Sequence, residues 1–351
     1  MSDQTQIDAD SAVFFKQAMQ LHQLGIYDRA ARLYARVLEK FPQHKQAMYL
    51  YNRLRRHNAA ASSSPWRVVW QHEPSGLWDE DWLDYLLADV PKGERVVDTK
   101  HSVFFDKMIV VDRNLSAAAE PYYANASFQG SHVVLFHLAD EWYTDDYACY
   151  TWCDRVFRNH WTFMHAENRK VMFFPLGYKT GFSSRKPSKP AAERRYLWSF
   201  MGDANKSSRQ AMLKAVQGIG ESFVHLTSGW NSPDALPTQR YREVMDESIF
   251  VPAPCGWQNL ESFRAWEALE AGCIPIVERR PQFDYFATLC GDYPFPSISD
   301  WSQAADFLKK DLAELEQLRQ RCSAWWQAHK ADIRSRIGTE LLGLSAATAA
   351  A

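Results

Sequence analysis

The sequence predicts an α/β protein with two doubly wound parallel-sheet domains behind a small helical segment. From Trp66 to about Leu344, apolar runs of strand length alternate with helical stretches, a pattern typical of parallel sheets with crossover helices. The chain has 351 residues, more than one ordinary domain needs. The first 58 residues instead carry the spacing of a helical hairpin.

The composition restricts the partners that the chain can have. With a formal net charge of -2 there is no electrostatic basis for nucleic-acid binding. No apolar stretch approaches the roughly 20 residues of a membrane span. The N-terminus shows neither the basic region nor the apolar run of a secretory signal. We therefore expect a cytoplasmic protein, with peripheral attachment at the inner face of the membrane as a variant of that location.

The N-terminal residues 1–58 resemble a tetratricopeptide hairpin. Between Ser11 and His44, six residues fall at the spacing of this 34-residue repeat: Gly25, Tyr27, Ala30, Tyr34, Val37 and Pro42. A second full copy is absent, although Ala47–Arg56 could form the next helix. Because a stable solenoid needs about three repeats, the hairpin should dock on the next domain, bind a protein partner or self-associate. The alternative is a plain helical extension.

Residues 65–183 are expected to form the first α/β domain, after a small, polar linker at Ala59–Pro65. Helical periodicity covers Trp78–Ala88. The strand candidates are Trp66–Trp70, Val96–Val97, Met108–Val111, Val133–Phe136 and Val171–Tyr178.

Residues 196–344 are expected to form the second α/β domain, beyond a hinge at Ser183–Arg195 that is rich in Ser, Pro, Lys and Arg. Its strand candidates are Tyr196–Met201, Ser222–Thr227, Ser248–Pro254 and Cys273–Val277. Helices are expected up to Val216, over Thr238–Asp246, and as two amphipathic helices at Trp301–Leu318 and Arg319–Leu344, the last crossing back to the first domain.

The loop Gly202–Arg209 joins the first strand of this domain to a helix. Backbone amides and positive side chains at such a junction can bind a phosphate, and Lys206 and Arg209 supply the charge. The spacing is not that of a Walker motif. An ordinary solvated turn is the alternative.

The segment Glu261–Val277 is the most informative part of the sequence. Wound at about 100° per residue, it places Arg264 and Glu267 on one stripe of a short helix and apolar residues on another. Gly272 ends this helix before a buried strand. A guanidinium suits a diphosphate, and a carboxylate one turn away can accept hydrogen bonds from two ribose hydroxyls. A surface ion pair between the two is the alternative.

The segment from Ser262 to Val277 resembles the Ser-Phe-Arg-x-x-Glu-Ala-Leu-x-Ala-Gly-Cys-Ile-Pro-Val signature of exostosin-like glycosyltransferases, with Ile276 at the usual valine. The resemblance implies a GT-B fold, two facing Rossmann-like domains with the donor nucleotide in the second. It places Arg209 and Arg264 on the diphosphate and Glu267 on the ribose. Lys206 is added from its charge and position, and Glu270 is the second choice for the ribose.

The resemblance also implies an inverting transferase that moves a sugar from a UDP-sugar to a glycan or glycoconjugate, such as a surface polysaccharide. Cations and helix amides would stabilise the leaving diphosphate, so we expect neither a cofactor nor a metal. The six cysteines are read as reduced core thiols rather than zinc ligands.

Direct displacement needs a general base on the acceptor side. The candidates follow two strands of the first domain: Glu141 first, then Asp140, and His72 with its neighbour Glu73. Two other functions stay open. The chain could be a scaffold with a retired transferase domain, or a nucleotide-sugar epimerase of similar architecture.

Overall fold

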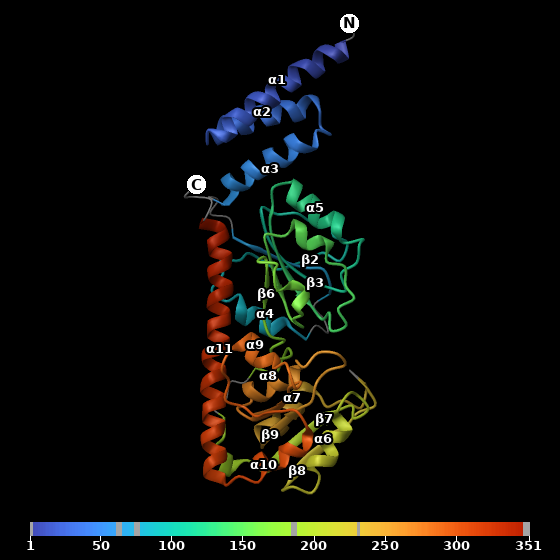
Figure 1. The fold of residues 1–351 in the computed structure, drawn as a ribbon, viewed down its shortest axis with the longest axis vertical. Coiled ribbons are helices and arrows are strands. Elements are labelled where there is room, and N and C mark those ends of the chain that lie inside the picture. The colour runs from blue at the N-terminus through green and yellow to red at the C-terminus, as the bar shows by residue number, and fades with distance from the viewer. Residues whose placement is uncertain (1–2, 61–64, 74–77, 184–187, 230–231, 347–351) are drawn as a thin grey trace.

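The protein is elongated, with its parts stacked along one axis (Figure 1). This computed structural model describes residues 3–60, 65–73, 78–183, 188–229 and 232–346. Three N-terminal helices lie at one end, a first α/β domain follows, and a second α/β domain forms the other end. The predicted fold class, α/β with two parallel-sheet domains behind a helical segment, is confirmed.

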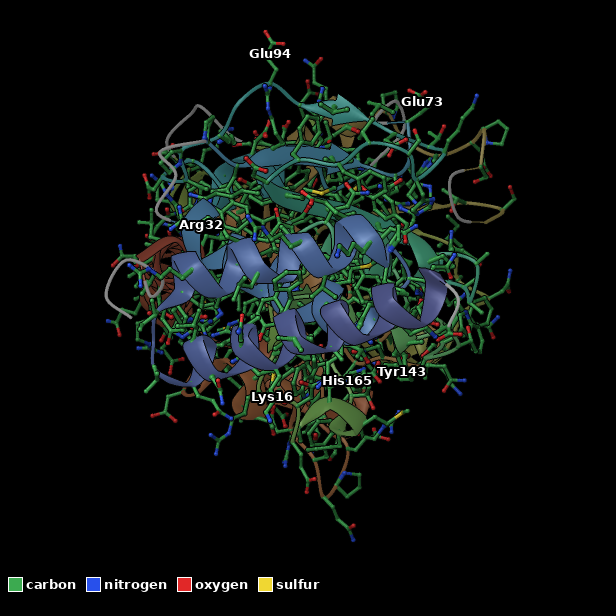
Figure 2. The ribbon with its side chains drawn as sticks, turned by 90° about the horizontal axis from the view of Figure 1, so that it is seen from above. Lys16, Arg32, Glu73, Glu94, Tyr143 and His165 are labelled. Carbon is green, nitrogen blue, oxygen red and sulfur yellow. The ribbon has the colours of Figure 1, made fainter. Side chains whose placement is uncertain are left out.

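The N-terminal helices form a small unit with its own core. They are α1 (Asp3–Gln23), α2 (Tyr27–Lys40) and α3 (Lys45–Ala60). Ala30, Tyr34 and Val37, three positions of the repeat pattern, are buried between them. Seen from the N-terminal end, α1 and α2 lie side by side across the first domain (Figure 2). The segment is helical as predicted, and its kinship with tetratricopeptide repeats stays a prediction.

The first domain is a six-stranded, fully parallel sheet with the order β2-β1-β3-β4-β5-β6. Two α-helices accompany it, α4 (Glu80–Leu86) and α5 (Glu120–Phe128). The strands are β1 (Arg67–Trp70), β2 (Val96–Val97), β3 (Lys107–Arg113), β4 (His132–Leu138), β5 (Arg155–Arg158) and β6 (Val171–Phe173). Strand β5 was not expected, because an arginine at each end interrupts its apolar pattern.

The second domain is a five-stranded, fully parallel sheet with the order β11-β10-β9-β7-β8. Its strands are β7 (Tyr196–Gly202), β8 (Ser222–Leu226), β9 (Ser248–Ala253), β10 (Ile274–Glu278) and β11 (Ser297–Ile298). Its helices before the last are α6 (Arg209–Val216), α7 (Thr238–Asp246), α8 (Phe263–Glu270), α9 (Tyr285–Cys290) and α10 (Ala304–Leu308). The predicted strands are all present, whereas α9 and β11 were not anticipated.

The expectation of two separate C-terminal amphipathic helices is wrong. After the short α10, one helix, α11, runs unbroken from Leu312 to Ala346. Its 35 residues make it about 50 Å long, enough to pass along both domains, as Figure 1 shows. Trp326 of α11 packs against Trp82 of the first domain and Trp266 of the second. The expected crossing back to the first domain is therefore confirmed.

Candidate functional site

A cavity of about 650 Å³ lies between the two α/β domains. Loops at the carboxyl ends of β4, β5, β7 and β9 converge on it, the place where open parallel sheets bind ligands. The first domain contributes Trp78, Asp79, Arg113, Ala139, Glu141, Asn159, His160, Leu176 and Lys179. The main contributions of the second domain are Gly202, Asp203, Lys206, Arg209, Tyr241, Gly256, Trp257, Glu261, Ser262, Arg264 and Glu267.

Three predicted cations meet on the second-domain wall of this cavity. The Arg264 Nη2 donates to the carbonyl of Met201 at 2.7 Å, and the Arg209 Nη1 donates to that of Asp203, also at 2.7 Å. Burial and the nearby Arg264 lower the pKa of Arg209 to about 10. Burial also lowers the pKa of Lys206. Two guanidinium groups and an ammonium therefore crowd one partly dehydrated wall, where an anion would relieve their repulsion.

Glu267 lies on the same wall, one turn along α8 from Arg264. Its side chain is buried, and burial raises the pKa of its carboxyl group, against the opposing effects of Lys179 and the Tyr241 hydroxyl. Arg264 is also buried, so the alternative of a surface ion pair is wrong. Both side chains contribute to the cavity lining, as the sequence predicted.

Buried polar atoms without hydrogen-bond partners gather around the cavity. Among the described residues, six lining side chains each hold such an atom: Asn159 Nδ2, His160 Nδ1, Arg209 Nε, Ser262 Oγ, Arg264 Nε and Glu267 Oε1. An unsatisfied buried donor or acceptor costs about 1–3 kcal/mol. Such a concentration is expected where a polar ligand completes the hydrogen bonding.

The three predicted base residues have different positions. Glu141 lines the cavity. Asp140 is buried behind it and accepts hydrogen bonds from Arg158 at 3.0 Å and Tyr147 at 2.5 Å, so it holds the loop rather than a substrate. His72 bonds Asp112 at 3.2 Å and is not among the lining residues. The catalytic expectations for Asp140 and His72 therefore lack support from the geometry.

Glu73 is exposed and is not among the residues that line the cavity. Figure 2 labels it near the upper edge of the molecule, away from the label of Tyr143.

Asp79 is a lining carboxylate that the sequence reasoning missed. It is 4 % exposed, and its nearest ionic partner is Arg113, with Nη2 at 3.4 Å from Oδ2. Burial raises the pKa of Asp79 to about 6, against the attraction of Arg113. Asp79 and Asp81 form an Asp-x-Asp sequence, but Asp81 is turned to the Gly181 amide, at 2.8 Å. The sequence analysis placed Asp79 inside the helical stretch Trp78–Ala88, whereas in the structure it directly precedes α4.

Glu270 does not take part in the cavity, contrary to the second choice for the ribose contact. Its Oε2 accepts from the Trp326 indole at 2.7 Å and from the Lys330 ammonium at 2.9 Å. Both partners belong to α11, which covers this face of α8. Glu270 therefore fixes the long helix to the second domain.

Glu261 joins the two walls of the cavity. Its Oε1 accepts from the Leu176 amide and the Trp266 indole, at 2.7 and 2.9 Å. Its Oε2 accepts from the His160 amide at 3.2 Å and the Tyr285 hydroxyl at 2.8 Å. Leu176 and His160 belong to the first domain, so this fully bonded carboxylate fixes one domain against the other.

One group of side chains has the composition of a metal site. Nitrogen and oxygen atoms of His137, Asp140 and Asp145 lie within 4.8 Å of one another. The His137 ring bonds Asp145 at 2.8 Å and Tyr150 at 2.6 Å, and the Arg158 guanidinium neutralises Asp140. The group is thus a hydrogen-bonded network around a buried arginine. Arg158 supplies the positive charge that a metal ion would otherwise bring.

The helices of the described part include none long and apolar enough to cross a membrane. All six cysteines are free thiols, four of them buried.

Comparison with known proteins gives a consistent likeness for the second domain. Residues 179–342 match the family model described as the RXYLT1 C-terminal domain. Curated relatives include ribitol-5-phosphate xylosyltransferase 1 of mouse, 25% identical over 163 residues, and of human, 25% identical over 170 residues. These matches cover 40% and 41% of this chain but only 36% and 37% of the relatives' length.

Two solved structures resemble a larger share of the chain more distantly. An α1,3-fucosyltransferase is matched with a TM-score of 0.48 at 13% identity, over 80% of this chain and 91% of that one. HepE of Anabaena in complex with UDP-glucose is matched with a TM-score of 0.49 at 11% identity, over 78% of this chain and 98% of that one. The exostosin resemblance has no counterpart in these matches and stays a prediction. By sequence, the chain is similar to the C-terminal domain of a xylosyltransferase.

Proposed function

We propose that this chain is an inverting glycosyltransferase that moves a sugar from a UDP-sugar to an acceptor held against the first domain. The observation that carries the proposal is the second-domain wall of the cavity. There, Arg209 Nε and Arg264 Nε are buried donors without partners, and Glu267 Oε1 is a buried acceptor without one. A nucleoside diphosphate offers a pyrophosphate for the first two and ribose hydroxyls for the third.

The cavity volume of about 650 Å³ lies within the range of about 300–1,000 Å³ usual for ligand pockets. We place the pyrophosphate between Arg209, Arg264 and Lys206. As the bond to the sugar breaks, negative charge grows on the leaving diphosphate, and these cations stabilise it without having to reorganise. The reaction then needs no metal, so a chelator should leave turnover unchanged.

The acceptor hydroxyl must lose a proton as it attacks. Two carboxylates of the first domain line the cavity, Glu141 and Asp79. Glu141 is the base expected from the sequence. Asp79 combines burial with a pKa raised to about 6, which suits a general base near neutral pH. Once transfer has been measured, its rate should be followed against pH. A fall in rate below about pH 6 that disappears in Asp79→Asn would assign the base to Asp79.

UDP-xylose is the first donor to test, because the curated relatives are named xylosyltransferases. For the acceptor we propose a glycan or glycoconjugate of the surface-polysaccharide type. The N-terminal helices are proposed to bind a protein partner or a second copy of the chain, outside the cavity.

The test is a thermal-shift screen of UDP-sugars, followed by measurement of UDP release with the donor that stabilises the protein most. Slow donor hydrolysis or transfer supports the transferase. A changed sugar that appears without acceptor would instead indicate an epimerase. Binding without any release of UDP, in the presence of varied glycans, would indicate a retired transferase domain acting as a scaffold.

A further inference from the structure

Three consecutive residues of the first domain, beginning with the cavity-lining Glu141, contact one loop of the second domain. Glu141 accepts hydrogen bonds from the Trp257 amide and, at 3.3 Å, from the Gln258 amide. Trp142 stacks on Trp257 with the ring centroids 6.2 Å apart. The Tyr143 hydroxyl accepts from the Asn259 side chain at 2.5 Å. We call residues 141–143 the strap and residues 256–259 the receiving loop.

The receiving loop is shaped to receive a negatively charged oxygen. Two successive amides converge on Oε1 of Glu141, and the Lys206 ammonium lies 3.7 Å from Oε2. Gly256 makes this approach possible, since a Cβ atom there would collide with the Glu141 carboxylate. Consecutive backbone amides beside a lysine are also a common cradle for phosphate oxygens.

The strap is held in an unusual backbone conformation. Ala139, just before it, has a φ of 68° and Tyr143, at its end, has a φ of 57°, both in the left-handed region that residues with a side chain seldom occupy. Such conformations cost of order 1–3 kcal/mol each and persist only where other contacts enforce them. Bonds within the first domain hold the start of this segment, from the Ala139 amide to Asn159 and from Arg158 and Tyr147 to Asp140. The contacts with the receiving loop hold residues 141–143, so releasing them would free these three residues to change shape.

Glu141 is also ion-paired with Lys206, one of the cations proposed to bind the donor. Lys206 is shared, because it faces both the receiving loop and the cavity that Arg209 and Arg264 line. Burial and the charges of Arg209 and Arg264 lower the pKa of Lys206, whereas Glu141 favours its charged form. The Glu141 carboxylate thus neutralises part of the positive charge on this wall, as a phosphate oxygen of the donor would.

We propose that Glu141 is an internal stand-in for the donor: it holds the strap against the receiving loop, and the diphosphate of the incoming nucleotide displaces it from that loop and from Lys206. Donor binding then opens the strap and sets the Glu141 carboxylate free on the acceptor side. This inference rests on the proposed function, because it assumes a diphosphate ligand.

The experiment is calorimetric titration of the full-length protein and its variants with UDP and, separately, with inorganic pyrophosphate. Glu141→Gln removes the charge that competes with the ligand and weakens the bonds to the loop. We expect its Kd for UDP to fall about tenfold, the change that loss of one charge-assisted contact predicts. Tyr143→Phe keeps every charge but loses the bond to Asn259 and the bond to the Trp161 carbonyl. We expect its Kd to fall about threefold.

Asp203→Asn is the matched control for charge alone. Asp203 lines the same cavity, and its side chain contacts the Asn205 amide rather than the receiving loop. If Asp203→Asn tightens UDP binding as much as Glu141→Gln does, or if Glu141→Gln binds UDP no better than the wild type, the stand-in role is refuted. If neither UDP nor pyrophosphate binds any of these proteins, the proposed function itself fails. If Glu141→Gln binds pyrophosphate more tightly than the wild type does but neither protein binds UDP, the stand-in role is supported and a uridine nucleotide is excluded as the ligand.

Discussion

Replacing Arg264 by alanine tests the donor site most directly. Its guanidinium donates a hydrogen bond to the Met201 carbonyl and lies 4.6 Å from the ring centroid of Phe200, and its Nε has no hydrogen-bond partner. Its charge also opposes that of Arg209, whose pKa is lowered partly for this reason. Arg264 is therefore poorly satisfied until an anion binds.

The size of the effect follows from these contacts. Two charge-assisted hydrogen bonds to a diphosphate are worth about 1.5–3 kcal/mol each, so their loss would weaken binding by about 10²–10⁴-fold. Relief of the repulsion at Arg209 recovers part of this, and we expect the Kd for UDP to rise about a hundredfold. The free energy of unfolding should change by less than about 2 kcal/mol, because the lost bond to Met201 is offset by removal of a buried unpaired donor.

The assay is calorimetric titration with UDP, together with thermal unfolding and circular dichroism to show that the fold is intact. Arg240→Ala is the matched control, since Arg240 is an exposed arginine of α7 paired only with Glu243. It should leave both Kd and unfolding unchanged. A folded Arg264→Ala protein with unaltered UDP affinity or turnover would refute the placement of the diphosphate on this wall.

Three further predictions concern other parts of the molecule. Glu267→Ala should raise the Kd for UDP at least about tenfold, because it removes the ribose acceptor. Glu270→Ala should leave this Kd unchanged but lower the free energy of unfolding by about 3–5 kcal/mol, because Lys330 loses its buried partner. If Glu270→Ala weakens UDP binding and Glu267→Ala does not, the two residues have each other's roles. Asp79 has a pKa of about 6 in the folded protein against 3.8 ordinarily, so its contribution to stability is complete below about pH 4 and is lost as pH rises through about 6. Asp79→Asn should therefore match the wild type at pH 4 and exceed it by up to about 3 kcal/mol at pH 7, and parallel melting curves at both pH values would contradict this. A chain that starts at residue 65 should fold and bind UDP with unchanged Kd, because the N-terminal helices have their own core; loss of binding would show that they shape the cavity.

Much of the fold could be read from local patterns. Strands such as β4 and β10 are continuous apolar runs, and fully buried strands of a parallel sheet must be apolar on both faces. The pairing of Arg264 with Glu267 on one stripe depends only on helical geometry, so it too was predictable. Both side chains do contribute to the lining of the cavity.

Charged residues that the fold buries were the main source of error. Strand β5 was missed because Arg155 and Arg158 bound it, and the cost of burying Arg158 is offset by Asp140 and Tyr150, which no local pattern shows. For the same reason Asp140 was expected in the site, although its carboxylate is used to hold this arginine. Asp79 was overlooked because it falls within the predicted helical stretch Trp78–Ala88, where local periodicity does not show that it lines the cavity between the domains.

The sequence by itself indicated most of the strands and helices, the break between two parallel sheets, and the position of Arg264 and Glu267 on one stripe of the helix that begins at Phe263. Only the tertiary structure decided which carboxylates serve the cavity. Glu267 and Glu270 are one turn apart on α8, and α11 covers one of them while the first domain faces the other. Helical periodicity fixes the angle between two side chains, but what each side chain meets depends on elements far away in the chain, which the local sequence does not encode.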